Sequence, residues 1–267
     1  MQTVDLKING HNWRAHLRDE ADQSVFNEIF KLTEYRAADS AIKNAKDPIV
    51  DVGAHAGFFS MYCRALNNKV KIFAVEPELK NLELLARHIK ENKIKNIKIV
   101  AGAMAEATGE RKLLISTDSH NHRLAEYGHD DETAAVKAFA FSDFCKQNKI
   151  KKISLLKIDI EGGEYEVFAG MSDQDLSMVN FVILEYHTSS PDFGAAEIAD
   201  PRFCPDFSRA EIADARFCAK AKSAQNRDKH KQIEEKLREN GFGVQVFPSR
   251  FDKTMGFIWA NNKRIKF

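Results

Sequence analysis

The stretch "IVDVGAHAGFFSMYC", which runs from Ile49 to Cys63, decides the fold of this chain. An apolar run typical of a buried strand leads into a short loop with glycines at Gly53 and Gly57, and a helical pattern follows. Glycine allows a tight turn and lets a ligand approach the backbone without a Cβ atom in the way. The N-terminus of a helix offers free N–H groups. This order predicts a ligand site beyond the carboxyl end of a parallel strand.

Apolar runs of the same kind recur along the chain, bounded by turn residues, as expected for strands buried on both faces. The runs are "PIVDVG" (48–53), "VKIFAVEP" (70–77), "IKIVAGA" (97–103), "ISLLKIDI" (153–160) and "NFVILEYH" (180–187). Helical patterns lie between them. One is the stripe of Leu82, Leu85, Ala86 and Ile89. The alternation predicts an α/β fold with a doubly wound, mostly parallel sheet.

The C-terminal part departs from this alternation. A helical pattern with Ile233 and Leu237 stops at Asn240-Gly241. Two strand patterns follow, "FGVQVFP" and "MGFIWAN", joined by a short link. We expect them to pair as an antiparallel hairpin at one edge of the sheet.

Composition narrows the classes of function. Among 267 residues, 40 are Lys or Arg and 39 are Asp or Glu, and this balance argues against broad electrostatic binding of nucleic acid. No apolar run approaches the roughly 20 residues that span a bilayer, and "MQTVDLKING" lacks the layout of a signal peptide. The cysteines are too few and too scattered for a disulfide framework. They are Cys63, Cys145, Cys204 and Cys218. We therefore expect a soluble cytoplasmic protein without a membrane partner.

Three kinds of ligand suit a glycine loop after a strand. A dinucleotide site needs G-x-G-x-x-G, but His55 stands at its middle glycine. A P-loop needs a lysine after its last glycine, but Phe58 follows Gly57. S-adenosylmethionine carries no phosphate, so the pattern D-x-G-x-x-x-G suits it best. Asp51 can face the ammonium group of this cofactor, and the backbone from Gly53 onwards can hold its methionine part.

The ends of the next two strands are consistent with a nucleoside. Glu76-Pro77 closes the second run, and an acid there can accept hydrogen bonds from ribose hydroxyls, in NAD as well as in S-adenosylmethionine. The third run closes with "VAGAMAE", where the adenine would meet the backbone of Ala103 and the side chain of Met104. The predicted cofactor site consists of Asp51, Gly53, Ala54, His55, Gly57, Phe58, Glu76, Pro77, Ala103, Met104 and Asp159.

Taken together with the fourth and fifth runs, these residues resemble the FkbM-type methyltransferase family. The matching pieces, in the family's order, are "VDVGAHAGFFS", "AVEPELKNLELLARHIKEN", "VAGAMAEATGE", "LLKIDIEGGEYEVFAG" and "ILEYH". The resemblance covers about half of the chain. It implies a Rossmann-like sheet of the class I methyltransferases, S-adenosylmethionine as donor, and usually O-methylation of a sugar or secondary-metabolite hydroxyl. The chain departs from the family at His55, where asparagine is common.

A single methyltransferase domain is expected over residues 1–267. Residues 1–47 form an N-terminal cap, with Phe26 and Tyr35 on a helix over the cofactor cleft, and residues 48–188 form the cofactor-binding core. Residues 189–220 are an insertion with the repeat "AEIADPRFC" and "AEIADARFC", and residues 221–267 hold the last helix and the edge strands. The insertion leaves the identity of the acceptor open.

The segment "KIDIEGGE", from Lys157 to Glu164, carries the candidate chemistry. A hydroxyl acceptor must lose its proton during methyl transfer, and a carboxylate or an imidazole can take it. Asp159 should lie near the methionine end of the cofactor, Glu161 is the preferred base, and His187 at the end of the fifth run is the neighbouring candidate. Structural roles stay open for each of them. Asp159 can pair with Lys157, Glu161 can cap the next helix, His187 can bond a carbonyl, and Glu164 is interpreted as a first-turn helix acid.

We expect no resident metal ion. His120, His122 and His129 share one polar loop with Asp130 and Asp131, but H-x-H without a second fixed pair is not a zinc signature. Oxygen ligands such as those of the "KIDIEGGE" segment would suit magnesium. The predicted partner is a small molecule or sugar with a hydroxyl group. The alternatives are a protein or RNA methyltransferase, and a NAD-binding oxidoreductase. The sequence leaves the oligomeric state open.

Overall fold

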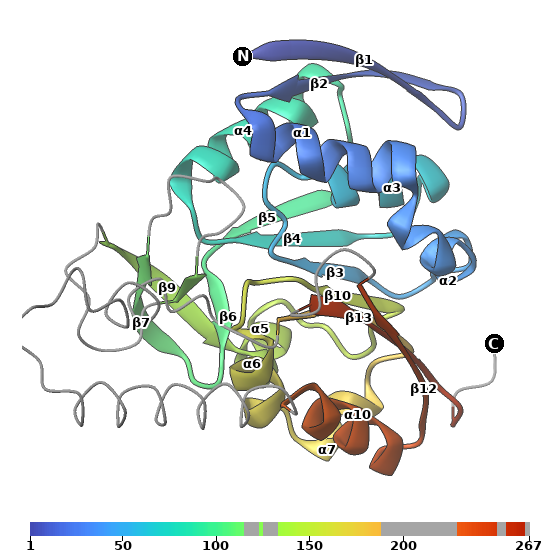
Figure 1. Cartoon of the computed structure of the whole chain (residues 1–267), viewed down its shortest axis with the longest axis vertical. Coiled ribbons are helices and arrows are strands. Elements are labelled where there is room, and N and C mark those ends of the chain that lie inside the picture. The colour runs from blue at the N-terminus through green and yellow to red at the C-terminus, as the bar shows by residue number, and fades with distance from the viewer. Residues whose placement is uncertain (115–122, 125–132, 188–228, 250–254, 265–267) are drawn as a thin grey trace, which may run out of the picture.

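A computed structural model describes residues 1–114, 123–124, 133–187, 229–249 and 255–264 (Figure 1). Its centre is a seven-stranded sheet in the order β12-β13-β11-β10-β3-β4-β5. The strands are β3 (Ile49–Val52), β4 (Ile72–Glu76), β5 (Ile97–Ala101), β10 (Leu155–Ile158), β11 (Phe181–His187), β12 (Phe242–Pro248) and β13 (Met255–Asn262). The strands from β5 to β11 are parallel, and β12 and β13 form an antiparallel edge. The predicted fold class is confirmed.

Alternate residues of the central strands enter two different apolar layers. In β10, Leu156 and Ile158 belong to one core cluster and Leu155 belongs to the other. In β11, Leu184 and Ile183 divide in the same way. Successive side chains of a strand point to opposite faces. Both faces are therefore covered, which explains why the strands read as continuous apolar runs.

Helices supply both covers of the sheet (Figure 1). They are α3 (Phe58–Leu66), α4 (Leu79–Glu91), α5 (Phe141–Gln147), α6 (Glu164–Gly170), α7 (Asp173–Ser177) and α10 (Lys229–Glu239). The buried stripe of α4 differs from the predicted one: Leu84, Leu85 and His88 are buried, and Ala86 is exposed. Because α4 begins at Leu79, directly after the end of β4 at Glu76, the direction in which the chain leaves β4 determines which face of α4 packs on the sheet. No described helix has the length and apolar character to cross a bilayer.

The third apolar run does not form one strand. Gly102 adopts a left-handed backbone (φ +152°), and the chain leaves β5 for a second sheet. That four-stranded sheet consists of β6 (Ala103–Ala105), β7 (Gly109–Leu114), β8 (Arg123–Leu124) and β9 (Thr133–Ala140). The loop histidines His120, His122 and His129, the insertion 189–220, Cys204 and Cys218 lie outside the described residues.

The N-terminal segment forms a hairpin that the sequence analysis missed. The elements are β1 (Gln2–Ile8), β2 (His11–Leu17), α1 (Glu20–Asn27), the π-helix η1 (Glu28–Leu32), the 3-10 helix η2 (Glu34–Ala38) and α2 (Asp39–Lys43). Phe26 and Tyr35 do not share one helix, because Thr33 adopts a left-handed conformation (φ +56°) and ends the run. Both side chains are buried, in the same core cluster as α3. The expected position of this segment over a cofactor stays a prediction.

His88 of α4 joins the hairpin to the glycine loop. Its Nε2 accepts a hydrogen bond from the backbone N–H of His16 at 2.8 Å, so the ring proton is on Nδ1, which donates to the carbonyl of Ala56 at 2.8 Å. The imidazole is fully buried. Burial, opposed by the bond to Ala56 and aided by His16, lowers the pKa of His88 to about 4. The folded protein therefore holds this ring neutral.

Acidification should weaken the fold through His88. Below the ordinary pKa of 6.5 the unfolded chain takes up a proton that the folded chain excludes. The free energy of unfolding should therefore fall by about 2 kcal/mol between about pH 7 and pH 5, as urea denaturation would measure. His88→Asn keeps an amide donor near the Ala56 carbonyl but cannot titrate. The free energy of unfolding of this variant should therefore fall less between about pH 7 and pH 5. Equal losses in the two proteins would contradict the assignment.

Gly53 closes the contact between the ends of β3 and β10. Its φ is +74°, and a Cβ atom there would lie 1.8 Å from the carbonyl oxygen of Asp159. Gly10, in the β1–β2 turn, has a similar φ of +78° with nothing within 4 Å of such an atom. A comparison of substitutions at these two glycines therefore separates the cost of backbone strain from the cost of steric overlap.

Substitution of these glycines by alanine should give unequal results. Gly10→Ala carries only the cost of a left-handed residue, about 1 kcal/mol. Gly53→Ala should lose a further 1–3 kcal/mol or so, because the strand ends must move apart. Chemical denaturation of both variants gives the comparison. If they are equally stable, the approach of Gly53 to Asp159 does not constrain the fold.

Candidate active site

The carboxyl ends of β3, β4, β10 and β11 lie at the same edge of the sheet, because the four strands are parallel neighbours. The glycine loop, residues 53–57, starts there. The backbone N–H groups of Gly53 and Ala54 both donate to the carbonyl of Val75, each at 3.0 Å. Gly57, at φ +84°, is the N-cap of α3. The predicted order of strand, glycine loop and helix is confirmed.

Glu76, at the end of β4, faces this loop. Its carboxylate accepts hydrogen bonds from the backbone N–H groups of His55 at 2.8 Å and Glu78 at 3.0 Å, and from the side chain of Asn81 at 3.2 Å. Burial raises the pKa of Glu76, although these three donors oppose the shift. A carboxylate has about four acceptor positions. The three donors leave room for one more.

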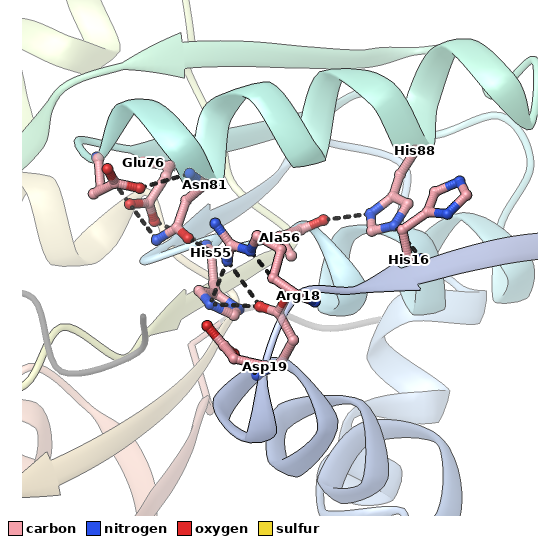
Figure 2. A network of polar contacts seen from close by, with 10 residues as sticks. His16, Arg18, Asp19, His55, Ala56, Glu76, Asn81 and His88 are labelled. Carbon is pink, nitrogen blue, oxygen red and sulfur yellow. Dashed lines mark hydrogen bonds and ion pairs between the residues drawn. The ribbon is translucent and has the colours of Figure 1, made fainter. Parts of the chain in front are cut away.

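A polar network extends from the glycine loop to the N-terminal segment (Figure 2). The guanidinium of Arg18 donates to Asp22 at 2.8 and 2.9 Å and to Asn81 at 2.7 Å. The ring of His55 lies 3.3 Å from both Arg18 and Asp22. His55 itself has a left-handed backbone, with φ +50°. Its side chain therefore turns toward the N-terminal segment. The histidine that replaces the middle glycine of a dinucleotide motif thus contacts Arg18 and Asp22.

Lys157 occupies the space between β3 and the loop after β10. Its buried ammonium donates to the carbonyl of Gly53 at 2.9 Å and lies 3.5 Å from Asp51 and 3.2 Å from Asp159. Asp51 is fully buried and also accepts from Ser60 at 2.7 Å. The oxygens of Asp51 are thus directed to Lys157 and Ser60. Its contact with a cofactor ammonium stays a prediction. The ion pair of Lys157 and Asp159, considered from the sequence, is present.

Of the two acids on Lys157, Asp159 is the accessible one. Its side chain is 28% exposed, whereas that of Asp51 is 0% exposed. Burial alone would raise the pKa of Asp159, but the positive charges of Lys157 and His187 outweigh this effect and lower it. Asp159 is therefore held as a carboxylate at the open side of the cluster.

Glu164 organises the loop that follows β10. It is fully buried, and one of its oxygens accepts hydrogen bonds from the backbone N–H groups of Ile160 at 3.2 Å and Gly162 at 3.1 Å. The same oxygen lies 3.1 Å from Nδ1 of His187. Glu164 is thus more than the first-turn helix acid that the sequence suggested. It ties the loop after β10 to the end of β11.

His187 and Glu161 meet on the open side of this arrangement. Nε2 of His187 lies 3.5 Å from Glu161, whose backbone is left-handed with φ +54°. Burial would lower the pKa of His187, but the bond to Glu164 and the charge of Glu161 raise it to about 10. One donor atom each from Asp159, Glu161 and His187 lies within 4.8 Å of the others. The structure therefore brings the three predicted catalytic residues together.

Other predicted site residues serve the core. Phe58 and Met104 are each 1% exposed and belong to the two main core clusters, and Ala54 and Ala103 are also buried. Packing accounts for Phe58 and Met104. Their contact with a cofactor, like that of Pro77, stays a prediction.

Sequence reasoning missed Arg18, Asp22 and Asn81. Arg18 and Asp22 precede the glycine loop by about thirty residues or more, and no spacing rule connects them to it. Asn81 could be found only as part of the first turn of α4. The role of Glu164 had a signal, because an acid directly after two glycines and a strand end can turn back on the loop.

Comparison with known proteins matches this site to one family. The methyltransferase FkbM domain model matches residues 51–244, which hold the glycine loop and the acidic loop. The hexuronic acid methyltransferase AglP of Haloferax volcanii is 26% identical over 173 residues, which cover 62% of this chain and 68% of that protein. The 31-O-demethyl-FK506 methyltransferase FkbM of Streptomyces tacrolimicus is 23% identical over 205 residues, covering 65% and 77%.

Among solved structures, methyltransferase FkbM from Methylobacillus flagellatus aligns with a TM-score of 0.47 and 12% identity. The alignment covers 80% of this chain and 43% of that one. The family match itself spans well over half of the chain. Its limits include the carboxyl end of β3 and all of β4, β10 and β11, with the residues that meet at their ends. The chain belongs to the FkbM family of methyltransferases.

Proposed function

We propose that this protein transfers the methyl group of S-adenosylmethionine to a hydroxyl group on a small molecule or a sugar. The observation that carries the proposal is the joint placement of two features at one sheet edge. The glycine loop with Glu76 lies after β3 and β4, and the cluster of Asp159, Glu161 and His187 lies after the neighbouring β10 and β11. A donor site and an acceptor site are thereby adjacent.

The residues present fit the cofactor. Glu76 keeps one acceptor position for a ribose hydroxyl, as counted above. The N-terminus of α3, behind Gly57, offers backbone N–H groups toward a carboxylate. Bound S-adenosylmethionine supplies an electrophilic methyl group on a sulfonium. The chain then has to position the acceptor, exclude water and remove one proton.

Glu161 is the group best placed to take that proton. Both ring nitrogens of His187 already face carboxylates, Glu164 and Glu161, so the imidazole has no free lone pair for an acceptor. Asp159 is paired with Lys157. Glu161 is 25% exposed and is held in a left-handed conformation, a strain that proteins retain mostly at functional positions. His187 then orients Glu161.

The names of the relatives suggest the acceptor class. AglP is described as a hexuronic acid methyltransferase, and the Streptomyces relative as a methyltransferase of 31-O-demethyl-FK506. A hydroxyl on a sugar or on a secondary metabolite is therefore the acceptor with which screening should begin. A panel of sugar glycosides, with methyl glucuronoside first, is the practical choice.

Glu76→Ala should weaken binding of S-adenosylhomocysteine by about tenfold or more, because a carboxylate that accepts from the ribose is lost. Isothermal titration calorimetry measures this directly. Glu110→Ala, which removes an exposed acid on β7, is the matched control and should bind as the wild type does. NADH should give no binding in any of the three proteins. Binding of NADH alone would replace methyl transfer with hydride transfer as the function.

Glu161→Gln should leave S-adenosylhomocysteine binding unchanged and lower turnover on the order of 10²-fold, as expected for loss of a general base. Turnover is measured as S-adenosylhomocysteine released with the first glycoside that the wild type methylates. Glu166→Gln makes the same chemical change on a partly exposed acid of α6 and should keep full activity. Full activity in Glu161→Gln would assign the proton transfer to another group.

A further inference from the structure

Three side chains with metal-ligand chemistry meet at the ends of β10 and β11. Donor atoms of Asp159, Glu161 and His187 lie within 4.8 Å of one another, and the Glu161 to His187 separation is 3.5 Å. Ligand atoms bound at about 2.1–2.5 Å from one ion lie up to roughly 4–5 Å apart. The three groups therefore need little movement to share one cation.

A buried carboxylate orients the imidazole of this group. Nδ1 of His187 faces Glu164, which is fully buried, so Nε2 is directed toward Glu161 and Asp159. A carboxylate behind the remote ring nitrogen is the usual way in which proteins fix a metal-binding histidine. Glu164 also holds the loop through the N–H groups of Ile160 and Gly162. One buried group thus orients His187 and holds the loop that carries Asp159 and Glu161.

The site also has more negative than positive side chains. Apart from His187 itself, the described cationic group in it is Lys157. The carboxylates are Asp51, Asp159, Glu161, Glu164 and Glu185. A bound cation would offset this excess of negative charge.

Glu164 has a second oxygen that the described residues leave without a donor. The side chain is fully buried, and Oε2, unlike the oxygen beside His187, accepts no hydrogen bond within the described part of the chain. A buried carboxylate oxygen of this kind calls for a polar or charged neighbour.

We propose that Asp159, Glu161 and His187 bind a divalent cation of the Mg²⁺ or Mn²⁺ type. Two carboxylates with one imidazole favour such an ion, with water or acceptor oxygens as its other ligands. The sequence analysis expected no metal, because the H-x-H pattern of the polar loop lacks a second fixed pair, although it noted that the oxygen ligands after β10 would suit magnesium. The parallel pairing of β10 with β11 adds His187 to these acids.

The consequence for catalysis rests on the proposed function, whereas cation binding does not. The acceptor oxygen becomes a ligand of the ion, which lowers the pKa of the hydroxyl. As the O–H bond breaks, the proton passes to the Glu161 oxygen that does not bind the ion. The electron pair left on the acceptor oxygen forms the new C–O bond with the methyl group. The electron pair of the broken S–C bond stays on sulfur, so atoms and charge balance.

The test is titration of the metal-free 1–267 protein with Mn²⁺, followed by electron paramagnetic resonance of the free ion. About one Mn²⁺ per chain should bind, and excess Mg²⁺ should displace it. Glu161→Gln and His187→Gln should each raise the dissociation constant for Mn²⁺ by about tenfold or more. Glu166→Gln, outside the cluster, should bind as the wild type does. Circular dichroism and S-adenosylhomocysteine binding show that each variant is folded.

The outcomes separate the two proposals. If the wild type binds S-adenosylhomocysteine but does not reduce the resonance signal of free Mn²⁺, the cation site is wrong and the proposed function stands. If the two cluster variants bind Mn²⁺ as tightly as the wild type, the ion sits elsewhere and the assignment is overturned. If Mn²⁺ binds at the cluster but S-adenosylhomocysteine does not bind, the proposed function fails and the cation site remains.

Discussion

The ammonium group of Lys157 lies where the two halves of the site meet, and the arrangement around it depends on its charge. An unpaired charge in a buried position costs several kcal/mol. Lys157 is satisfied by Asp51 from β3, by the carbonyl of Gly53 and by Asp159 from its own loop. The glycine loop and the acidic loop are therefore joined through one cation. Because Asp51 is used in this way, the open carboxylates of the site are those of the loop after β10.

Both of these loops hold non-glycine residues in left-handed conformations, His55 after β3 and Glu161 after β10. Each such residue costs on the order of 1 kcal/mol and persists only where surrounding contacts hold it. His55 is held by Arg18 and Asp22, and Glu161 is held beside His187. The two turns that face the site therefore both carry backbone strain, while the strands behind them are regular and buried.

The N-terminal segment forms part of the site, although it precedes the matched family domain. It contacts the glycine loop twice, through the network of Arg18, Asp22 and Asn81 and through the neutral ring of His88 (Figure 2). The second contact works only while His88 is uncharged, because its Nε2 accepts from the backbone of His16. The position of the glycine loop is therefore coupled to the docking of the hairpin.

The sequence by itself determined the parallel sheet, the antiparallel edge and the glycine loop, because these follow from local patterns: apolar runs, glycine spacing and helix stops. It also singled out Asp159, Glu161 and His187 as candidate catalytic residues, and the structure brings these three together. Only the tertiary structure decided their partners. Whether Asp51 faces a ligand or Lys157, whether Glu164 caps a helix or orients His187, and whether Gly102 ends a strand all depend on contacts between distant segments. A polar side chain is directed by the partner that folding brings to it, and that partner is not encoded in its neighbours along the chain.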